Sequence, residues 1–249
     1  MNFAMEELKK LLKRTDGQLL LALSLWPVLF SIIIRISPSV MNYSGKLSGL
    51  GFLNQQLFVQ SGILVPLILM IYMASLSFYQ EMEEKQVYLY KDIPRIDILH
   101  GKYFSIFTMY FLFLLLFMAS SILSYYLIFQ GVDQASGSFL LDKEEWILLY
   151  DNFQIVLAFV FYIHIGLSLS LRLPTGASIF GALFLYLFIK TTPEIQWAKY
   201  LTPAGFREII DFGGNNLLLT LALSLLVWLL YNIPLYLWNR HYYRHAEFN

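Results

Sequence analysis

Long runs of apolar residues, separated by short polar stretches, follow one another along the whole chain. A helix crosses the ~30 Å hydrocarbon core of a bilayer with about 20 apolar residues. The runs are continuous and show no strict alternation, which favours membrane helices over a β-barrel. We therefore predict an all-α integral membrane protein, a single transmembrane domain over 18–240. Its six spans are expected at 19–36, 57–79, 103–129, 146–171, 177–189 and 217–238.

The composition agrees with this class. Of the 249 residues, 58% are hydrophobic and only 14% are charged, whereas a soluble domain carries about 25% charged residues. These values exclude a water-soluble globule, and the abundance of large apolar residues excludes a disordered chain. The formal net charge is +0, which gives no general attraction to nucleic acid, so we expect no nucleic-acid partner. The absence of cysteine rules out disulfides and thiolate metal sites in this chain.

Basic residues indicate the orientation in the membrane. Six spans bring both termini to one side, and the segments on that side hold eleven of the 17 Lys and Arg residues. The positive-inside rule then places both termini, including the tail 241–249, in the cytoplasm. We expect the membrane to be the plasma membrane. The eleven residues are Lys9, Lys10, Lys13, Arg14, Lys85, Lys91, Arg95, Lys102, Arg172, Arg240 and Arg244.

The N-terminal segment 1–17 has the pattern of a basic amphipathic helix. Such a helix, directly before a span, is expected to lie in the cytoplasmic membrane interface. A solvated basic terminus that only sets the topology is the alternative. We expect Glu6 and Lys10 to form an i,i+4 ion pair. The predicted apolar face is Met1, Met5, Leu8 and Leu12, and the predicted charged face is Glu6, Lys9, Lys10 and Lys13.

The connection 79–103 carries more structure than a simple loop requires. It continues the second span as a charged helix, with Glu81 and Lys85 spaced i,i+4. Pro94 then favours the first turn of a second short helix, which we expect to end at Gly101. That helix would carry an apolar stripe of Ile93, Ile96 and Leu99. The stripe suits a groove in a partner protein, and equally the bilayer or the protein's own spans.

The segment 191–214 follows a short apolar run. The thirteen residues of 177–189 make a helix of about 20 Å, which does not reach across the bilayer core. Thr192-Pro193 and Thr202-Pro203 are each an N-cap followed by a proline, so each predicts a short helix. These helices are expected either to re-enter the membrane or to lie outside it.

Few residues carry recognisable chemistry. The chain has neither the GxxxxGK[ST] phosphate loop nor an HExxH pair, and its four histidines are scattered, so we predict no enzyme and no metal site. His164 and Asn232 fall within predicted spans. An ionisable residue there suggests a function, here a candidate cargo path, although one hydrogen-bonded histidine is more often structural.

The order of features around 79–103 resembles the permease subunits of ABC-2-type ABC transporters. Two further segments add to the likeness: the N-terminal helix resembles the interfacial elbow helix of that family, and Leu201-Thr202-Pro203 resembles its outer re-entrant region. The residues that carry the resemblance are Glu81 and Glu84, Lys85, Pro94-Arg95, and then Ile98, Leu99, Gly101 and Lys102 entering the third span.

This resemblance implies a transport subunit rather than an enzyme. Such a subunit pairs with a second permease, identical or not, and with cytosolic ABC ATPase subunits that hold ATP and Mg²⁺, while the permease itself binds no cofactor. The cargo would be amphiphilic, such as an antimicrobial peptide or a drug, and is exported. A stand-alone secondary carrier or a membrane scaffold is the alternative. The implied ATPase-coupling surface is Glu81, Glu84, Lys91, Pro94, Arg95, Ile96 and Leu99.

Overall fold

A computed structural model describes residues 3–37, 45–85, 92–141, 145–195, 197–210 and 216–245. These residues form helices and no β-strand, apart from one isolated bridge between Leu47 and Ala135. The α-helices are α1 Phe3–Lys13, α2 Thr15–Leu23, α3 Trp26–Ile36, α4 Gly49–Ile63, α5 Val65–Ser75, α6 Glu81–Glu83, α7 Arg95–Leu127, α8 Trp146–Ser170, α9 Thr175–Thr191 and α10 Leu217–His245. A π-helix, η2 (Leu76–Gln80), joins α5 to α6, and 3-10 turns form η4 (Phe129–Gly131), η6 (Thr192–Glu194), η7 (Lys199–Leu201) and η8 (Pro203–Ile209).

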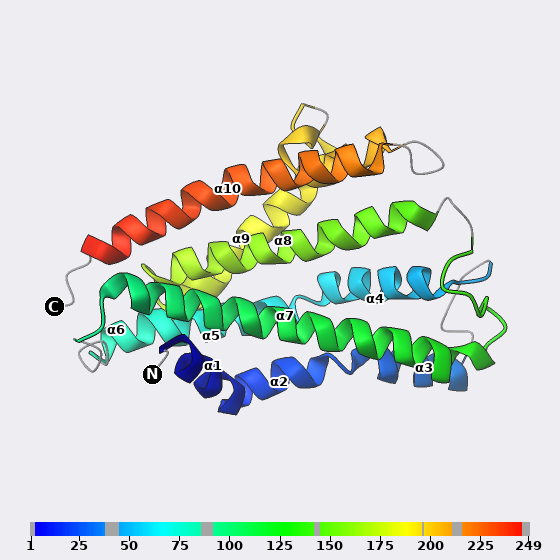
Figure 1. Cartoon of the computed structure of the whole chain (residues 1–249), viewed down its shortest axis with the longest axis horizontal. Coiled ribbons are helices and arrows are strands. Elements are labelled where there is room, and N and C mark those ends of the chain that lie inside the picture. Colours follow the sequence, from blue (N-terminus) through cyan, green and yellow to red (C-terminus); the bar gives the residue numbers. More distant parts are fainter. Residues whose placement is uncertain are drawn as a thin grey trace.

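The longer helices run side by side along the long axis of the molecule (Figure 1). Helix α8 lies centrally and packs against α4, α5, α9 and α10, while α7 packs against α1, α3 and α4. Helix α1, helix α6, the start of α7 and the last turns of α10 all lie at one end (Figure 1), which we call the termini end. The opposite, far end holds the start of α4 and the end of α7.

Five helical stretches are long and apolar enough to cross a membrane, and α2 with α3, bent by 42°, would make a sixth if they form one span. The described part of the chain is therefore all-helical and has the make-up of a multi-pass membrane protein. The five stretches are Val65–Glu83, Arg95–Gly131, Trp146–Ser170, Thr175–Glu194 and Leu217–His245.

Two prolines lie close to breaks in the helices of the first two predicted spans. Proline lacks an N–H and its ring clashes with the carbonyl four residues earlier. Accordingly, α2 ends at Leu23, four residues before Pro27, and α4 ends at Ile63, just before Pro66. Leu64 between α4 and α5 is left-handed, with φ of 61°. The predicted span 57–79 therefore falls on parts of α4 and of α5–η2, with the break at Leu64 between them.

The two breaks are neighbours in space. Leu23 and Trp26 of the first break line a small cavity together with Ile63, Val65 and Pro66 of the second. Helix α7, which packs against α4, runs without interruption for 33 residues. Its length is about 50 Å at 1.5 Å per residue. One continuous helix thus lies beside two broken ones (Figure 1).

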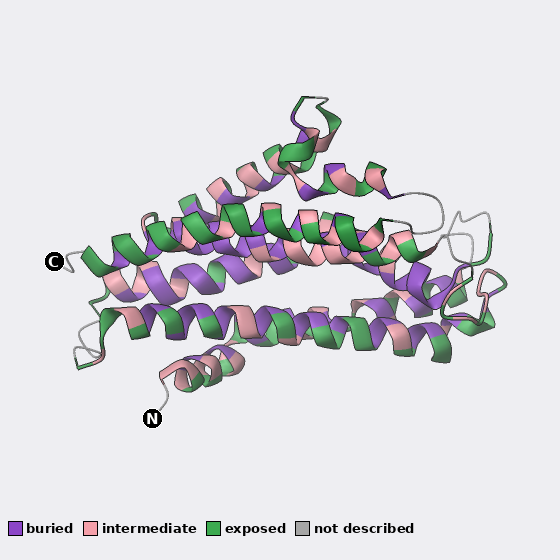
Figure 2. Cartoon of the chain, turned by 45° about the horizontal axis from the view of Figure 1, so that its top comes forward, coloured by how far each residue is buried: buried purple, intermediate pink, exposed green. Residues whose placement is uncertain are grey.

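Helices α9 and α10 bury the least of their surface. Only 22% and 17% of the residues in their most apolar windows are buried, against 56% in α8. Their outward faces are coloured largely exposed or intermediate in Figure 2. An apolar face of this extent needs a cover, which lipid supplies in a membrane. It includes Phe180, Phe184, Leu187 and Phe188 of α9 and Leu218, Leu226, Leu229 and Leu230 of α10.

The segment η6–η8 folds back against the bundle. It packs on α8 and α10 and lies near the middle of the long axis, not at the far end (Figures 1 and 2). The hydroxyl of Tyr150 donates to the carbonyl of Pro203 at 2.6 Å, and Arg207 forms two hydrogen bonds with Asp151. Helix η8 begins at Pro203, as the sequence predicts, whereas α9 extends beyond the predicted end at 189.

Candidate functional site

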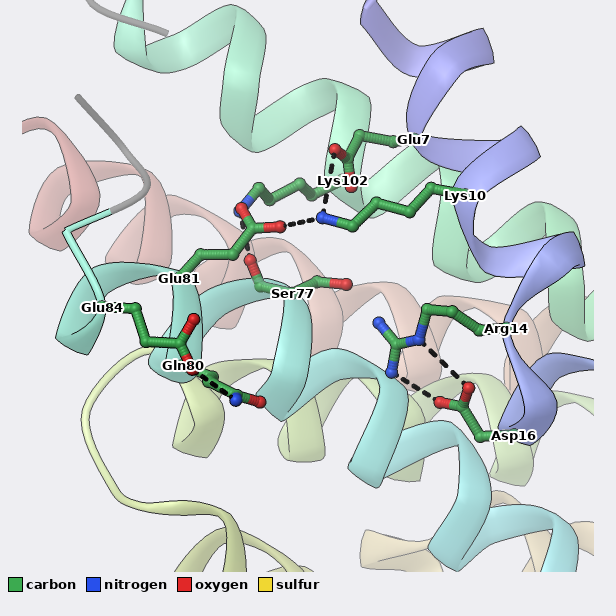
Figure 3. Close-up of polar contacts among 9 residues, drawn as sticks. All are labelled: Glu7, Lys10, Arg14, Asp16, Ser77, Gln80, Glu81, Glu84 and Lys102. Carbon is green, nitrogen blue, oxygen red and sulfur yellow. Dashed lines mark hydrogen bonds and ion pairs between the residues drawn. The ribbon is translucent and has the colours of Figure 1, made fainter. Parts of the chain in front are cut away.

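A cluster of charged side chains joins three elements at the termini end (Figure 3). Oε2 of Glu81, in α6, lies 2.5 Å from Nζ of Lys102, in α7. Oε1 of the same carboxylate accepts a hydrogen bond from Nζ of Lys10, in α1. Glu7 lies on the other side of Lys10, at 3.9 Å. Two acidic and two basic side chains thus balance one another.

The central pair of this cluster is almost completely removed from solvent. The exposed fractions of Lys102 and Glu81 are 1% and 3%. Because a buried charge without a partner is very unfavourable, each of the two depends on the other. Lys102 also donates to the carbonyl of Ser77, and its ammonium lies 5.2 Å from the centre of the Phe78 ring. The pair therefore holds the start of α7 against α6.

The π-helix η2 makes the Ser77 carbonyl available to Lys102. At its end, the N–H of Glu81 bonds to the carbonyl of Phe78, three residues back, rather than to that of Ser77. In a regular α-helix that N–H would occupy the Ser77 carbonyl. Such π-bulges are frequent at functional sites, and here the bulge supplies one of the oxygen ligands of the buried ammonium.

Helix α1 lies close against α7. Ser105 donates to the carbonyl of Ala4 at 2.8 Å, and a Cβ placed on Gly101 would stand 2.4 Å from the ring of Phe3. Gly101 therefore permits close contact between the helices. It does not end a short helix as predicted, since α7 runs through it from Arg95 to Leu127.

Part of the predicted apolar face of α1 packs against the protein itself. Leu8 and Leu12 of that face contact the core, while Met5 is 44% exposed. Leu11 and Glu7, outside the predicted face, are buried. Lys9, not Lys10, pairs with Glu6, at 2.8 Å, so the predicted Glu6–Lys10 pair is wrong. Glu81 pairs with Lys102 and Lys10, while Lys85, four residues on, has φ of 58° beyond the end of α6. Lys9 and Lys13 lie on the exposed side.

Neighbouring glutamates of α1 have opposite electrostatic environments. Burial raises the pKa of Glu7, and the negative charge of Glu81 raises it further, while Lys10 acts in the opposite direction. The hydrogen bond from Lys9 lowers the pKa of Glu6. Only Glu7 therefore gains from taking up a proton in the folded protein.

The seven predicted coupling residues divide into an exposed and a buried group. Glu84, Pro94 and Arg95 are exposed and Ile96 is half-buried. Glu81 and Leu99 are buried, at 3% and 0% exposure, so neither offers its side chain to a partner. Lys91 lies outside the described residues.

Arg95, one of the exposed residues of this group, lies beside the end of α10. Arg95 donates to the carbonyl of Arg244 at 3.3 Å, and His100 Nε2 lies 2.6 Å from the hydroxyl of Tyr236. Glu84 accepts a hydrogen bond from Gln80 at 2.6 Å. The start of α7 is thus connected to both the α6 arm and the C-terminal helix. Ile93, in the predicted apolar stripe, packs against the protein's own core.

His164 of α8 and Asn232 of α10 are brought together inside the bundle. Nδ1 of His164 lies 2.8 Å from Oδ1 of Asn232, and the amide nitrogen of Asn232 donates to the carbonyl of Trp228. The histidine therefore donates through Nδ1, which leaves Nε2 as a bare acceptor. Nε2 is buried and has no partner among the described residues.

The sequence analysis missed Glu7, Ser77 and Lys102 as members of the site. A signal was present for Lys102: it opens the apolar run of the third span, and Glu81 closes that of the second. Opposite charges at adjoining ends of two membrane helices are expected to pair. The role of the Ser77 carbonyl depends on the π-helix, for which the sequence gives no signal.

Within the described ranges, no group of three or more His, Asp or Glu side chains is placed to hold a metal ion. Comparison with protein-family models, curated proteins and solved structures finds no match for this chain.

Proposed function

We propose that this chain is the permease subunit of an ATP-driven exporter of the ABC-2 type. A separate cytosolic ATPase would bind ATP and Mg²⁺ and dock on the termini end. The permease would act with a second copy or a sister permease, and its cargo would be an amphiphile such as an antimicrobial peptide or a drug.

This proposal rests on the carboxylate of Glu81, which contacts a lysine on each of two other helices. One carboxylate joins the end of the α6 arm to Lys102 of α7 and to Lys10 of α1. Glu84, Pro94 and Arg95 remain exposed on the same connection. Force applied to that surface would pass through a buried ion pair into a helix that runs the length of the bundle.

The arrangement of the helices supports the finer parts of the proposal. Helices α2 and α3 would together be the first of six spans, and the positive-inside rule favours a cytoplasmic termini end in the plasma membrane. The segment η6–η8, beside the middle of the bundle, would be re-entrant, since non-helical backbone is tolerated at membrane depth where protein covers it. The tie between Tyr150 and Pro203 would provide part of that cover.

The test is a purified complex with its ATPase. The chain is isolated from its native membrane without crosslinking, and the ATPase that accompanies it is identified and co-expressed. We expect the chain alone to hydrolyse no ATP. In the complex, Arg95→Glu with Ile96→Asp should weaken assembly or uncouple hydrolysis from transport.

A matched control is Lys46→Glu, which reverses an exposed charge outside the termini end and should change neither property. If the double variant behaves like this control, the coupling role of the connection is wrong. If an ion gradient drives transport of the cargo with no ATPase present, the protein is a secondary carrier. The bare Nε2 of His164 inside the bundle is the observation that favours that second candidate.

A further inference from the structure

A cavity opens between α8, α9, α10 and η8, away from the charged cluster. Its volume is about 170 Å³, close to the ~150 Å³ of an engineered cavity that holds benzene. Most of its wall is apolar, as in typical small-molecule sites. The apolar lining includes Ile155, Ala158, Phe159, Ile189 and Pro203.

Two buried N–H donors on this wall lack a partner. Gln154 and Trp228 both line the cavity and are 9% and 5% exposed. Neither Nε2 of Gln154 nor Nε1 of Trp228 has a hydrogen-bond acceptor among the described residues. Buried polar groups in folded proteins are nearly always satisfied. A ligand that brings oxygen acceptors to this wall would supply the partners that the two donors lack.

A positively charged side chain lines the same cavity. Lys190 is an exposed lining residue, and its Nζ donates to the hydroxyl of Tyr186 at 3.0 Å. That hydroxyl donates onward to the carbonyl of Ser61 at 2.8 Å. An ammonium has three N–H groups, so it retains donors for a ligand. No ion pair of Lys190 with a carboxylate is formed within the described ranges.

These features define the chemistry of an occupant. The wall is apolar, no carboxylate is among the described lining residues, and the polar groups with spare capacity are mainly N–H donors. A positive or purely apolar molecule would leave the donors unsatisfied, which is costly in a buried site. A molecule with an apolar chain, oxygen acceptors and a negative head satisfies all of them.

We propose that this cavity binds the apolar chain of an anionic amphiphile, with its head group on Lys190 and its oxygen acceptors on Gln154 and Trp228. Membrane acyl lipids with an anionic head and free fatty acids share this chemistry. Binding would clamp η8, which contributes Pro203 to the wall, against α8. It would occur with or without a partner ATPase, so it does not depend on the function proposed above.

Quenching of Trp228 fluorescence by brominated ligands tests the site directly. The full chain with Trp26, Trp146, Trp197 and Trp238 each replaced by Phe retains Trp228 alone and is placed in phosphatidylcholine nanodiscs. The probes are dibromostearate, its uncharged methyl ester and a brominated alkylamine. We expect saturable quenching by dibromostearate, at an affinity about tenfold or more above those of the other two, as for a charge-assisted hydrogen bond.

Substitutions of the residues that line the cavity show how much each contributes to binding of dibromostearate. Lys190→Met should weaken dibromostearate binding about tenfold and Lys190→Arg should retain it, while Lys46→Met should have no effect. Ala204→Phe, at an exposed lining position, and Ala158→Phe should each block quenching. Since Ala204 is exposed, its variant is expected to fold even if that of Ala158 does not.

Nanodiscs that contain brominated phosphatidylglycerol or brominated phosphatidylcholine distinguish the two sources of the ligand. Stronger quenching by the anionic lipid identifies a membrane lipid as an occupant, and quenching by dibromostearate alone identifies a free acid. Equal quenching by the acid and its methyl ester would overturn the proposal. Undiminished quenching in a folded Ala204→Phe variant would do the same.

Discussion

Glu81 and Lys102 face each other across the connection between α6 and α7, with 2.5 Å between carboxylate and ammonium. Both are buried, and Lys10 reaches the second oxygen of the same carboxylate. Two remote stretches of sequence, 3–13 and 95–127, are thereby held by one side chain (Figure 3).

Loss of one partner from this pair should be worse than loss of both. Lys102→Met leaves the Glu81 carboxylate buried with only Lys10, and we expect it to lower the free energy of unfolding by about 3 kcal/mol. Lys102→Met with Glu81→Gln removes the buried charge and should recover more than half of that loss. Thermal unfolding in detergent, followed by circular dichroism, measures both. Lys9→Met, which removes an exposed ion pair, should leave the stability nearly unchanged. Equal destabilisation by the single and double variants would contradict the assignment.

The corner between α1 and α2 should tolerate only glycine at position 17. A Cβ on Gly17 would stand 2.1 Å from the carbonyl oxygen of Leu11, so Gly17→Ala must displace the backbone of α1. We expect a loss of about 1–3 kcal/mol, as in other overpacked sites, and faster proteolysis within α1. Gly62→Ala is the control, because nothing lies within 4 Å of its Cβ; it should be neutral or slightly stabilising. Comparable losses at both positions would show that steric conflict at the corner is not the cause.

The raised pKa of Glu7 predicts a specific dependence of stability on pH. A carboxyl with a raised pKa in the folded state contributes stability below its ordinary value of 4.5, and that contribution is lost as pH rises through the folded-state pKa. Glu7→Gln should therefore be at least as stable as the parent at pH 7 and lose this advantage toward pH 4. Melting temperatures of the two proteins across this range measure the difference.

Glu6 provides the opposite case one residue away. Its pKa is lowered by Lys9, so its stabilising effect is present at neutral pH and lost as pH falls through the folded-state value. Glu6→Gln should thus approach the parent at low pH, whereas Glu7→Gln should fall relative to it. Parallel pH profiles for the two variants would contradict the distinct environments described here.

The absence of native cysteine makes sidedness directly measurable. We expect a membrane-impermeant maleimide to label Lys46→Cys on intact cells. It should label Lys9→Cys only after lysis, because the proposed topology puts the basic termini end in the cytoplasm. Both positions are exposed, so each should react when the reagent reaches it. The reverse labelling pattern would invert the proposed topology.

The helical membrane class could be predicted from the sequence because hydrophobic length dominates it. The starts of η8 at Pro203 and of α7 next to Pro94 also follow from local rules for proline. The interruption at Leu64 could not be predicted with the same certainty. Pro66 indicates a kink, but a left-handed leucine depends on tertiary packing, which no local pattern encodes.

The charged cluster was predictable only in part. Glu81 and Lys10 were candidates, but they were assigned to a coupling surface and to the charged face of an interfacial helix. Their contact with each other depends on where α1 docks, and α1 docks where Gly101 has no side chain and Ser105 donates to the carbonyl of Ala4. A helical wheel of α1 alone does not show this contact, because it leaves out the neighbouring helix that supplies Lys102.

The paired breaks at Leu23–Trp26 and Ile63–Pro66 divide α2–α3 and α4–α5 into shorter rods at one level, around a shared cavity. Bending there requires rotation of few backbone bonds and leaves the packed rods intact. The uninterrupted α7 has no such break along its 33 residues. If a partner pushes on the charged cluster as proposed, α7 would move as one unit while the two broken helices beside it bend at their breaks.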